Sequence, residues 1–533
     1  MPNTAPSTSQ LTERRQTNLA IVGLAIGMLL STLDQTIVAT ALPSMAGELG
    51  SLSSITWVVS AYLLTTTASA PLYGKLSDIY GRRRMVLIAL SIFIVASILC
   101  GLAPNTGTLI ALRVLQGLGG GGLLTLGSAG IAGLVPLHER GKALSYTGTV
   151  FAIGSVGGPL LGGFFTDYLD WRWVFYINVP LGLIAVLLVV AYFHAERIET
   201  SGGIDAPGAA LLVSAVTSAM LVTVWGGRDY AWTSPVIIAL ALATAGLLAS
   251  FVWWEGKKAA NPVLPLHLFK APAFRFAVPA SLLLGMLLLG AVVFLPQFFQ
   301  ATRNMSAATS GLALTPLMLG ICITMTVVGR RVTATGRYRI FPILGATLTI
   351  AGFAALTGID RHTSIWLIAV EMFVLGTGLG FQIQLLVLTM QNSAEPQDLG
   401  VASSTAMFCR SMGGAMGTAL FSTVLVRQLS DRLADKAPSG TGSSASADQL
   451  VRQGLTSQST LPPSVRQVFA QTFADSIHVV FIWALPLAGA LLLLAVLAPA
   501  VPLWTVEFLR KFKEDHEAKL AAAAVAESPQ EPR

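Results

Sequence analysis

Long apolar stretches alternate with short polar ones along nearly the whole chain. From Leu19 to about Leu503, mostly apolar runs of about twenty residues follow one another, the length that a helix needs to cross a bilayer core about 30 Å thick. The pattern predicts about fourteen transmembrane helices. Their predicted first residues are Leu19, Ile55, Met85, Thr108, Lys142, Trp173, Asp205, Pro235, Phe274, Ser310, Ile340, Ser364, Gly400 and Asp475.

The composition supports a membrane protein and excludes several kinds of chemistry. The chain is 53% hydrophobic and 11% charged, with a mean hydropathy of +0.70, outside the usual range of soluble proteins. Its three cysteines lie within apolar runs, so we expect neither disulfides nor a bound metal. The sequence contains neither an H-E-x-x-H motif nor a nucleotide-binding loop. We therefore expect no cofactor and disfavour an intramembrane enzyme and an ATP-driven pump.

The distribution of charge predicts the orientation. Most Lys and Arg residues fall in the two tails and in alternate loops, which places those segments in the cytoplasm. The first apolar run follows Arg14 and Arg15 and has no small-residue cleavage site, so we interpret it as a mature helix and not a signal peptide. The net charge of +7 then reflects topology, and no nucleic-acid partner is expected.

Two sequence repeats divide the chain into halves. "GKLSDIYGRRR" (Gly74–Arg84) matches "GRRVTATGRYR" (Gly329–Arg339), and "FAIGSVGGP" (Phe151–Pro159) matches "MFCRSMGGA" (Met407–Ala415). Each pair is eight predicted helices apart, which indicates two six-helix halves separated by two additional helices. Parallel halves of six helices are typical of secondary transporters, whose substrate path runs between the halves.

The expected fold is an all-α polytopic membrane protein with a 6+2+6 arrangement of helices. Two connections are unusual: a basic, proline-containing linker, and a long outer loop with a Ser/Gly/Ala-rich centre. For the outer loop we expect either a flexible loop or a membrane-surface hairpin. The predicted segments are a cytoplasmic tail at 1–18, a first six-helix bundle at 19–200, two inserted helices at 201–256, a cytoplasmic linker at 257–272, a second six-helix bundle at 273–506 that contains the outer loop 427–474, and a cytoplasmic tail at 507–533.

Four charged residues lie well inside predicted spans: Asp34 in "STLDQTIVATALP", Arg113, Glu371 and Arg410. Each costs about 2.5 to 3.5 kcal/mol on insertion scales, so each is expected to face a partner or a cavity. At about 1.5 Å per residue, the first three lie in the outer half of the membrane and Arg410 lies closer to the inner side. We predict that Asp34 binds protons and that Arg113 tunes it. Glu371 is either a second proton or cation site or a structural partner near the outer mouth.

Several motifs resemble those of the major facilitator superfamily. The Gly74–Arg84 stretch resembles the family's loop between the second and third helices, and "RVLQG" from Arg113 resembles its R-x-x-Q-G motif. The resemblance implies the major facilitator fold and a role for Arg113 in proton transfer. It also implies a conformational latch made by Gly74, Asp78, Gly81, Arg82 and Arg83. The second copy of this loop has Thr333 at the position of Asp78, which makes an equivalent latch there doubtful.

Two further stretches narrow the resemblance. "GSVGGPLLGG" resembles the antiporter motif of exporters in this superfamily. "LDQTIVATALP" and "WRWVFYINVPLG" resemble segments of the fourteen-helix drug:proton antiporters of the EmrB/QacA type. The resemblance covers about residues 19 to 200 and 370 to 420. The residues that match the antiporter motif are Gly154, Gly158, Pro159, Gly162 and Gly163.

We therefore expect a proton-coupled antiporter that exports drugs or other amphipathic small molecules from a bacterial cytoplasmic membrane, with both termini cytoplasmic and the chain a monomer. The alternatives are a dedicated exporter of an endogenous antibiotic, siderophore or lipid, an uptake symporter, and a channel. The proton gradient would supply the energy. The candidate cavity residues are Trp57, Tyr62, Gln116, Phe294, Gln297, Phe381, Gln384 and Arg410.

Overall fold

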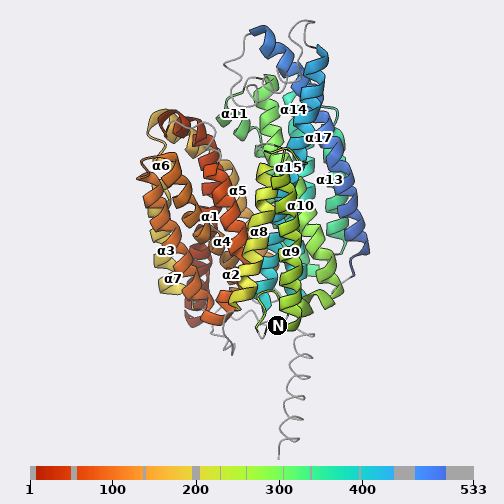
Figure 1. The fold of residues 1–533 in the computed structure, drawn as a ribbon. Coiled ribbons are helices and arrows are strands. Elements are labelled where there is room, and N and C mark those ends of the chain that lie inside the picture. The colour runs from red at the N-terminus through yellow and green to blue at the C-terminus, as the bar shows by residue number, and fades with distance from the viewer. Residues whose placement is uncertain are drawn as a thin grey trace, which may run out of the picture.

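The computed structural model is built from helices packed side by side along one axis (Figure 1). It describes residues 8–49, 57–135, 140–194, 205–227, 230–259, 261–303, 305–335, 339–394, 398–436 and 463–499. The helices of the first part are α1 (Thr8–Leu49), α2 (Trp57–Tyr80), α3 (Arg82–Gly101), α4 (Thr106–Leu134), α5 (Arg140–Tyr168), α6 (Trp173–Tyr176), α7 (Asn178–Tyr192), α8 (Ala206–Trp225) and α9 (Pro235–Lys257). Those of the second part are η2 (Leu266–Lys270), α10 (Pro272–Arg303), α11 (Ala307–Leu312), α12 (Thr315–Thr335), α13 (Ile340–Leu356), α14 (Ile365–Asn392), α15 (Leu399–Lys436) and α17 (Pro463–Leu497).

The helices agree with the hydropathy pattern. Each predicted span overlaps a helix, and eleven of the described helices are long and apolar enough to cross a membrane. Several begin at side-chain caps: Asn105, Asp205 and Ser234 accept hydrogen bonds from the first-turn backbone N–H groups of α4, α8 and α9. The all-helical membrane fold is therefore confirmed, whereas the count of fourteen spans stays a prediction.

The packing repeats with the period that the sequence predicts. In the first half, α1 packs against α4, α5 and α7, while α4 also packs against α2 and α3. In the second half, α10 packs against α14, α15 and α17, while α14 also packs against α12 and α13. The halves meet where α5 packs on α12 and where α2 packs on α15. The two contacts are equivalent, because α2 corresponds to α12 and α5 corresponds to α15 in the repeat.

The inserted helices α8 and α9 pack against each other and lie in front of the line where the halves meet (Figure 1). α8 contacts both α2 and α15, so it touches both halves. α9 exposes apolar side chains such as Leu242 and Val252, as expected for a lipid-facing helix. At its end, the Glu255 carboxylate accepts the backbone N–H groups of Val263 and Leu264, which fixes the linker to the bundle.

The described parts of the N-terminal tail and of the outer loop are helical. Residues 427–436 continue α15 and residues 463–474 belong to α17, so both ends of the predicted loop are helical. The loop centre at 437–462 lies outside the described residues, as do 1–7 and 500–533. α1 begins at Thr8, within the segment predicted as the tail 1–18. The helix therefore extends beyond the apolar run into the polar residues that precede it.

Tight contacts join the halves at one end of the molecule, which we call the Asp78 end. A Cβ added to Gly74 of α2 would collide with Ser404 of α15, and one added to Gly400 would collide with Asp78. Between α5 and α12, the Cys322 thiol donates to the Gly148 carbonyl at 3.4 Å. The halves are thus closed against each other at the Asp78 end.

Candidate functional site

A fully buried ion pair lies inside the first half. Asp34 on α1 and Arg113 on α4 are both 0% exposed, and Arg113 Nη1 donates to Asp34 Oδ2 at 2.5 Å. The same guanidinium donates to Gln116 Oε1 at 2.7 Å and, through Nε, to the Val58 carbonyl at 3.0 Å. Arg113, which the sequence predicts as the residue that tunes Asp34, is its ion-pair partner in the structure.

Three neutral polar side chains complete the surroundings of Asp34. Gln116 donates to Asp34 Oδ1 at 3.0 Å and to Ser97 Oγ at 2.7 Å. Asn178, at the start of α7, donates to Ser97 Oγ at 2.9 Å and approaches Asp34 Oδ1 at 3.4 Å. Asp34 therefore accepts from donors on α4 and α7, as a buried carboxylate requires.

Aromatic rings close the ion pair off from the rest of the protein. The Arg113 guanidinium carbon lies 4.2 Å from the centre of the Tyr62 ring and 5.8 Å from that of Phe175. Tyr62 and Ser31 share a hydroxyl hydrogen bond of 2.9 Å. Arg113 Nη2 and Asn178 Oδ1 are buried without a hydrogen-bond partner among the described residues, which leaves one donor and one acceptor available beside the pair.

Sequence analysis did not select Ser97 or Asn178. The only signal was the polar Asn178 in "WRWVFYINVPLG", a string chosen for its family resemblance. The same string contributes a second contact, between the end of α1 and the residues before α6. There Arg172 pairs with Glu48 at 2.8 Å, and the Trp171 indole donates to Glu48 at 2.7 Å. The hydrogen bonds from Arg172 and then Trp171 lower the pKa of Glu48, since they favour its charged form.

The other two charges within predicted spans lie apart from this network. Glu371 on α14 is partly buried, and its Oε2 has no hydrogen-bond partner among the described residues. Arg410 on α15 contacts the sulfur of Met407 at 2.8 Å. Both belong to the second half, so neither forms an ion pair with Asp34 or Arg113 within the described chain.

Three glycines of the predicted antiporter motif, Gly154, Gly158 and Gly162, face α1. Thr36, two residues after Asp34, donates to the Gly154 carbonyl at 2.9 Å. A Cβ at Gly158 would overlap the Thr36 hydroxyl, and one at Gly162 would overlap that of Thr40. The glycines are needed here because α1 and α5 approach too closely for any larger residue. Pro159 instead contacts Gly311 of α11.

The predicted latch lies where the halves meet at the Asp78 end. Arg82 Nη2 lies 3.9 Å from Asp78 Oδ1, and Arg83 donates to the Val190 carbonyl of α7 at 2.5 Å. Gly81 joins α2 to α3 with a φ of 91°, which favours glycine. Asp78 reaches the first turn of α15 at Gly400, where the helix dipole favours a negative charge. The side chain of Thr333, its counterpart in the repeat, lies outside the described side chains.

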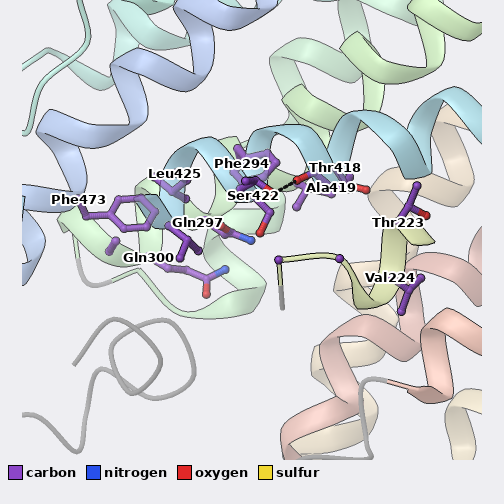
Figure 2. Close-up of a pocket in the computed structure, with 16 residues that line it drawn as sticks. Thr223, Val224, Phe294, Gln297, Gln300, Thr418, Ala419, Ser422, Leu425 and Phe473 are labelled. Carbon is purple, nitrogen blue, oxygen red and sulfur yellow. Dashed lines mark hydrogen bonds between the residues drawn. The ribbon is translucent and has the colours of Figure 1, made fainter. Parts of the chain in front are cut away.

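A cavity of about 520 Å³ lies at the opposite end of the bundle, which we call the cavity end. It is formed by α10, α15, the start of α17 and the turn after α8 (Figure 2). Its polar lining comes from hydroxyl and amide side chains, and its apolar lining includes Phe294 and Phe473. The lining residues are Thr223, Val224, Gly226, Gly227, Val293, Phe294, Gln297, Gln300, Ala301, Thr418, Ala419, Ser422, Thr423, Leu425, Val426 and Phe473.

The structure places only two of the predicted cavity residues, Phe294 and Gln297, at this cavity. The other predicted residues lie elsewhere in this conformation. Tyr62 of α2 and Gln116 of α4 belong to the buried network: Tyr62 shares a hydrogen bond with Ser31 of α1, and Gln116 accepts from Arg113. Trp57 packs against Trp225 of α8, and Phe381 stacks on Phe341 of α13.

The last two predicted cavity residues also lie outside the lining. Gln384 is buried in α14, which contributes no lining residue, and Arg410 lies beside Met407 in a part of α15 that precedes the lining residues. The cavity itself is lined by the second half and the inserted helices, and it includes no residue of α1–α7. This cavity therefore does not extend across both halves.

Comparison with known proteins identifies the family. The model of the Major Facilitator Superfamily matches residues 24–418. The chain is a member of the major facilitator superfamily. It is 35% identical to the multidrug transporter protein MdtP of Bacillus subtilis, over 96% of this chain and 97% of that protein. It is also 34% identical to multidrug resistance protein 3 of the same species, over 94% of this chain and 98% of the relative.

A third relative and two solved structures agree with this family. An uncharacterized MFS-type transporter of Mycobacterium tuberculosis is 36% identical over 94% of this chain and 73% of its own length. The human organic anion transporter MFSD10 superposes with a TM-score of 0.57 at 14% identity, covering 89% of this chain and 99% of that one. The proton:xylose symporter XylE gives 0.55 at 14% identity, covering 87% and 96%. At such low identity, these two structures support the major facilitator fold alone.

Proposed function

We propose that this transporter is a proton-coupled antiporter that exports amphipathic small molecules by alternating access. The observation that carries the proposal is the sealed Asp34–Arg113 pair, an ionisable pair that the bilayer makes costly and that a purely structural helix contact does not need. The multidrug transporters that align over nearly the whole chain support export as the direction. In this proposal Asp34 takes up and releases the proton.

The separation of the two sites suggests how coupling works. The ion pair lies in the first half, whereas the cavity is lined by the second half and the inserted helices. Substrate and proton therefore do not compete for one carboxylate in this conformation. Coupling then acts through opposite conformational states: protonation of Asp34 weakens its attraction to Arg113 and favours the state in which the cavity faces the other side.

The proposed orientation places the Asp78 end in the cytoplasm, because its loop carries Lys75 and three arginines. The cavity then opens outward, the state in which substrate leaves and protons enter. Both termini are cytoplasmic in this proposal, the membrane is a bacterial cytoplasmic membrane, and the transporter acts as a monomer. One charge moving through about 100 mV supplies about 2.3 kcal/mol, and each 1.4 kcal/mol supports about tenfold accumulation.

The test is transport by purified protein in liposomes under an imposed pH gradient. We expect Asp34→Asn to abolish gradient-driven uptake, while Asp431→Asn, at an exposed carboxylate of α15, retains it. Glu371→Gln should lower the rate if Glu371 is a second proton or cation site, and should leave it unchanged if its role is structural. Full gradient-driven transport by Asp34→Asn would contradict the proposal.

A dedicated exporter of an endogenous metabolite is the second candidate. Fungal relatives named efflux pumps, such as LUC4 of Fusarium, 31% identical over 89% of this chain, support export in either case. A panel of drugs and metabolites in whole cells separates the two. A protonophore should stop efflux in either case, whereas an ATP-driven pump would continue. Saturable counterflow distinguishes a carrier from a channel. The direction in which substrate accumulates relative to the proton gradient distinguishes an antiporter from a symporter.

A further inference from the structure

The hydrogen bonds that reach the Asp34 carboxylate within the described chain come from N–H donors. Arg113 Nη1 donates to Oδ2 at 2.5 Å, while Gln116 Nε2 donates to Oδ1 at 3.0 Å and Asn178 Nδ2 at 3.4 Å. Such donors stabilise the charged carboxylate. A protonated carboxyl carries an O–H group that needs an acceptor, so the uptake of a proton requires one of these neighbours to change its role.

Two of the three neighbours keep their roles in both protonation states. A guanidinium has only donors, so Arg113 donates whatever the charge of Asp34. The same property fixes the Gln116 amide, whose Oε1 accepts from Arg113 Nη1 at 2.7 Å. A turned Gln116 amide would set its NH₂ group against the guanidinium, so Gln116 continues to present Nε2 to Asp34.

Asn178 differs, because both of its partners can reverse their roles. Its Nδ2 donates to Ser97 Oγ at 2.9 Å, and a serine hydroxyl can donate as well as accept. Its other partner is the Asp34 carboxyl, which becomes a donor when it is protonated. A half-turn of the amide about its Cβ–Cγ bond exchanges Nδ2 and Oδ1, and Oδ1 then accepts from both groups. Ser97 meanwhile continues to accept from Gln116 Nε2 at 2.7 Å.

The packing of α7 favours a turn of this side chain over a movement of the helix. Asn178 is fully buried at the start of α7, and its side chain does not cap that helix. A Cβ added to Gly182 of α7 would collide with Ile94 of α3, and one added to Gly23 of α1 would collide with Leu188 of α7. The backbone of α7 is therefore held against both helices while the amide exchanges its ends.

We propose that Asn178 is the positioning residue for the proton on Asp34: its amide donates to the carboxylate and, after a half-turn, accepts the O–H group of the protonated carboxyl. The new O–H bond forms at Asp34 Oδ1, and the hydronium ion that supplies the proton loses one O–H bond and becomes water. Oδ2 stays toward Arg113. Because the loss of charge weakens that attraction, the carboxyl moves toward Asn178 and closes the present gap of 3.4 Å. The inference rests on the proposed function, in which Asp34 takes up the proton.

Proton binding by Asp34 tests this role. Infrared difference spectra of the transporter in lipid, recorded as the pH is lowered, follow the C=O band of protonated carboxyl groups, and the part missing in Asp34→Asn belongs to Asp34. Asn178→Leu keeps the size of the side chain and removes both roles of the amide, so Asp34 should bind the proton about tenfold more weakly. The titratable groups that face Asp34 from other helices, Arg113 on α4, Tyr62 on α2 and Cys100 on α3, are unchanged in this variant.

The direction of the change separates this role from a purely structural one. If Asn178 only stabilised the charged carboxylate, Asn178→Leu would make Asp34 bind the proton more tightly. Asn178→Asp places a second carboxyl beside Asp34, where the two share one proton, and should bind it at least about tenfold more tightly. Asn105→Leu is the matched control: it removes a cap of α4 that accepts from the Thr108 N–H at 2.8 Å, and should leave the titration unchanged.

The outcomes distinguish this inference from the proposed function. Equal or tighter proton binding by Asn178→Leu, or unchanged binding by Asn178→Asp, overturns the role of Asn178 while the proposed function stands. A carboxyl band without a contribution from Asp34 contradicts both. Full gradient-driven transport by Asp34→Asn, with the infrared results as expected, contradicts the proposed function alone.

Discussion

Arg113 and Asp34 form a 2.5 Å ion pair in which neither side chain is exposed to solvent. Arg113 also donates to the Val58 carbonyl and to Gln116, while Asp34 also accepts from Gln116 and Asn178, so each charge is held by three partners. The two side chains differ in their chemistry: a carboxylate can take up a proton, whereas an arginine stays charged. This difference predicts that the two residues respond differently to substitution.

Arg113→Ala should destabilise the protein by about 3 to 5 kcal/mol, because it leaves Asp34 charged and unpaired in a buried position. The double variant Arg113→Ala with Asp34→Asn should recover much of that loss, since it removes the charge as well as its partner. Thermal unfolding in detergent, measured for both single variants and the double variant, checks this cycle. If the losses of stability in the two single variants simply add in the double variant, the two residues act independently, which would contradict this prediction.

The helix positions were predictable because a helix that crosses a bilayer needs a run of about twenty mostly apolar residues, which is visible in the sequence. Even so, α2 and α15 are absent from the helices that are apolar enough to span by composition alone. α2 contains "TTTASAP", and both helices carry small polar residues where the halves meet. Their prediction depended on the alternation of loops and on the internal repeat.

The site was predictable only where a residue type is costly in a membrane. Asp34 and Arg113 stood out because charges are rare in such helices, and the structure pairs them. Ser97 and Asn178 did not stand out, since small neutral polar residues are common in membrane helices. Six of the eight predicted cavity residues do not line this cavity, because a sequence does not show which side of a helix another helix covers. Gln297 and Phe294 are exceptions.

The contact between α1 and α5 yields a sharp comparison between adjacent glycines. A Cβ at Gly158 would overlap Thr36, whereas one at Gly157 would approach no closer than 3.7 Å, to a Leu33 methyl group. Gly158→Ala should therefore destabilise the transporter by about 1 to 3 kcal/mol, and Gly157→Ala should have little effect. Adding Thr36→Ala to Gly158→Ala makes room and should restore part of the loss. Thermal unfolding and transport rate are the measurements, and equal effects at both glycines would refute the close approach.

The Asp78 end provides the last prediction. Gly74 of α2 lies against Ser404 and the Gly400 carbonyl of α15, so Gly74→Ala should push these helices apart. An overlap that costs about 1 to 3 kcal/mol shifts a two-state equilibrium by about 5- to 150-fold toward the state that is open at this end. The shift should appear as a longer distance between spin labels on the exposed residues Tyr80 and Arg339, measured by double electron–electron resonance.

Two controls complete this experiment at the Asp78 end. Adding Ser404→Gly should relieve the overlap and return the distance toward that of the parent protein, because Ser404 provides the nearest atoms. Gly489→Ala on α17 has open space around it and should leave the distance unchanged. The labels require a background in which Cys100, Cys322 and Cys409 are replaced. If Gly74→Ala leaves the distance distribution unchanged while transport falls, the close contact of α2 and α15 does not control which end is open.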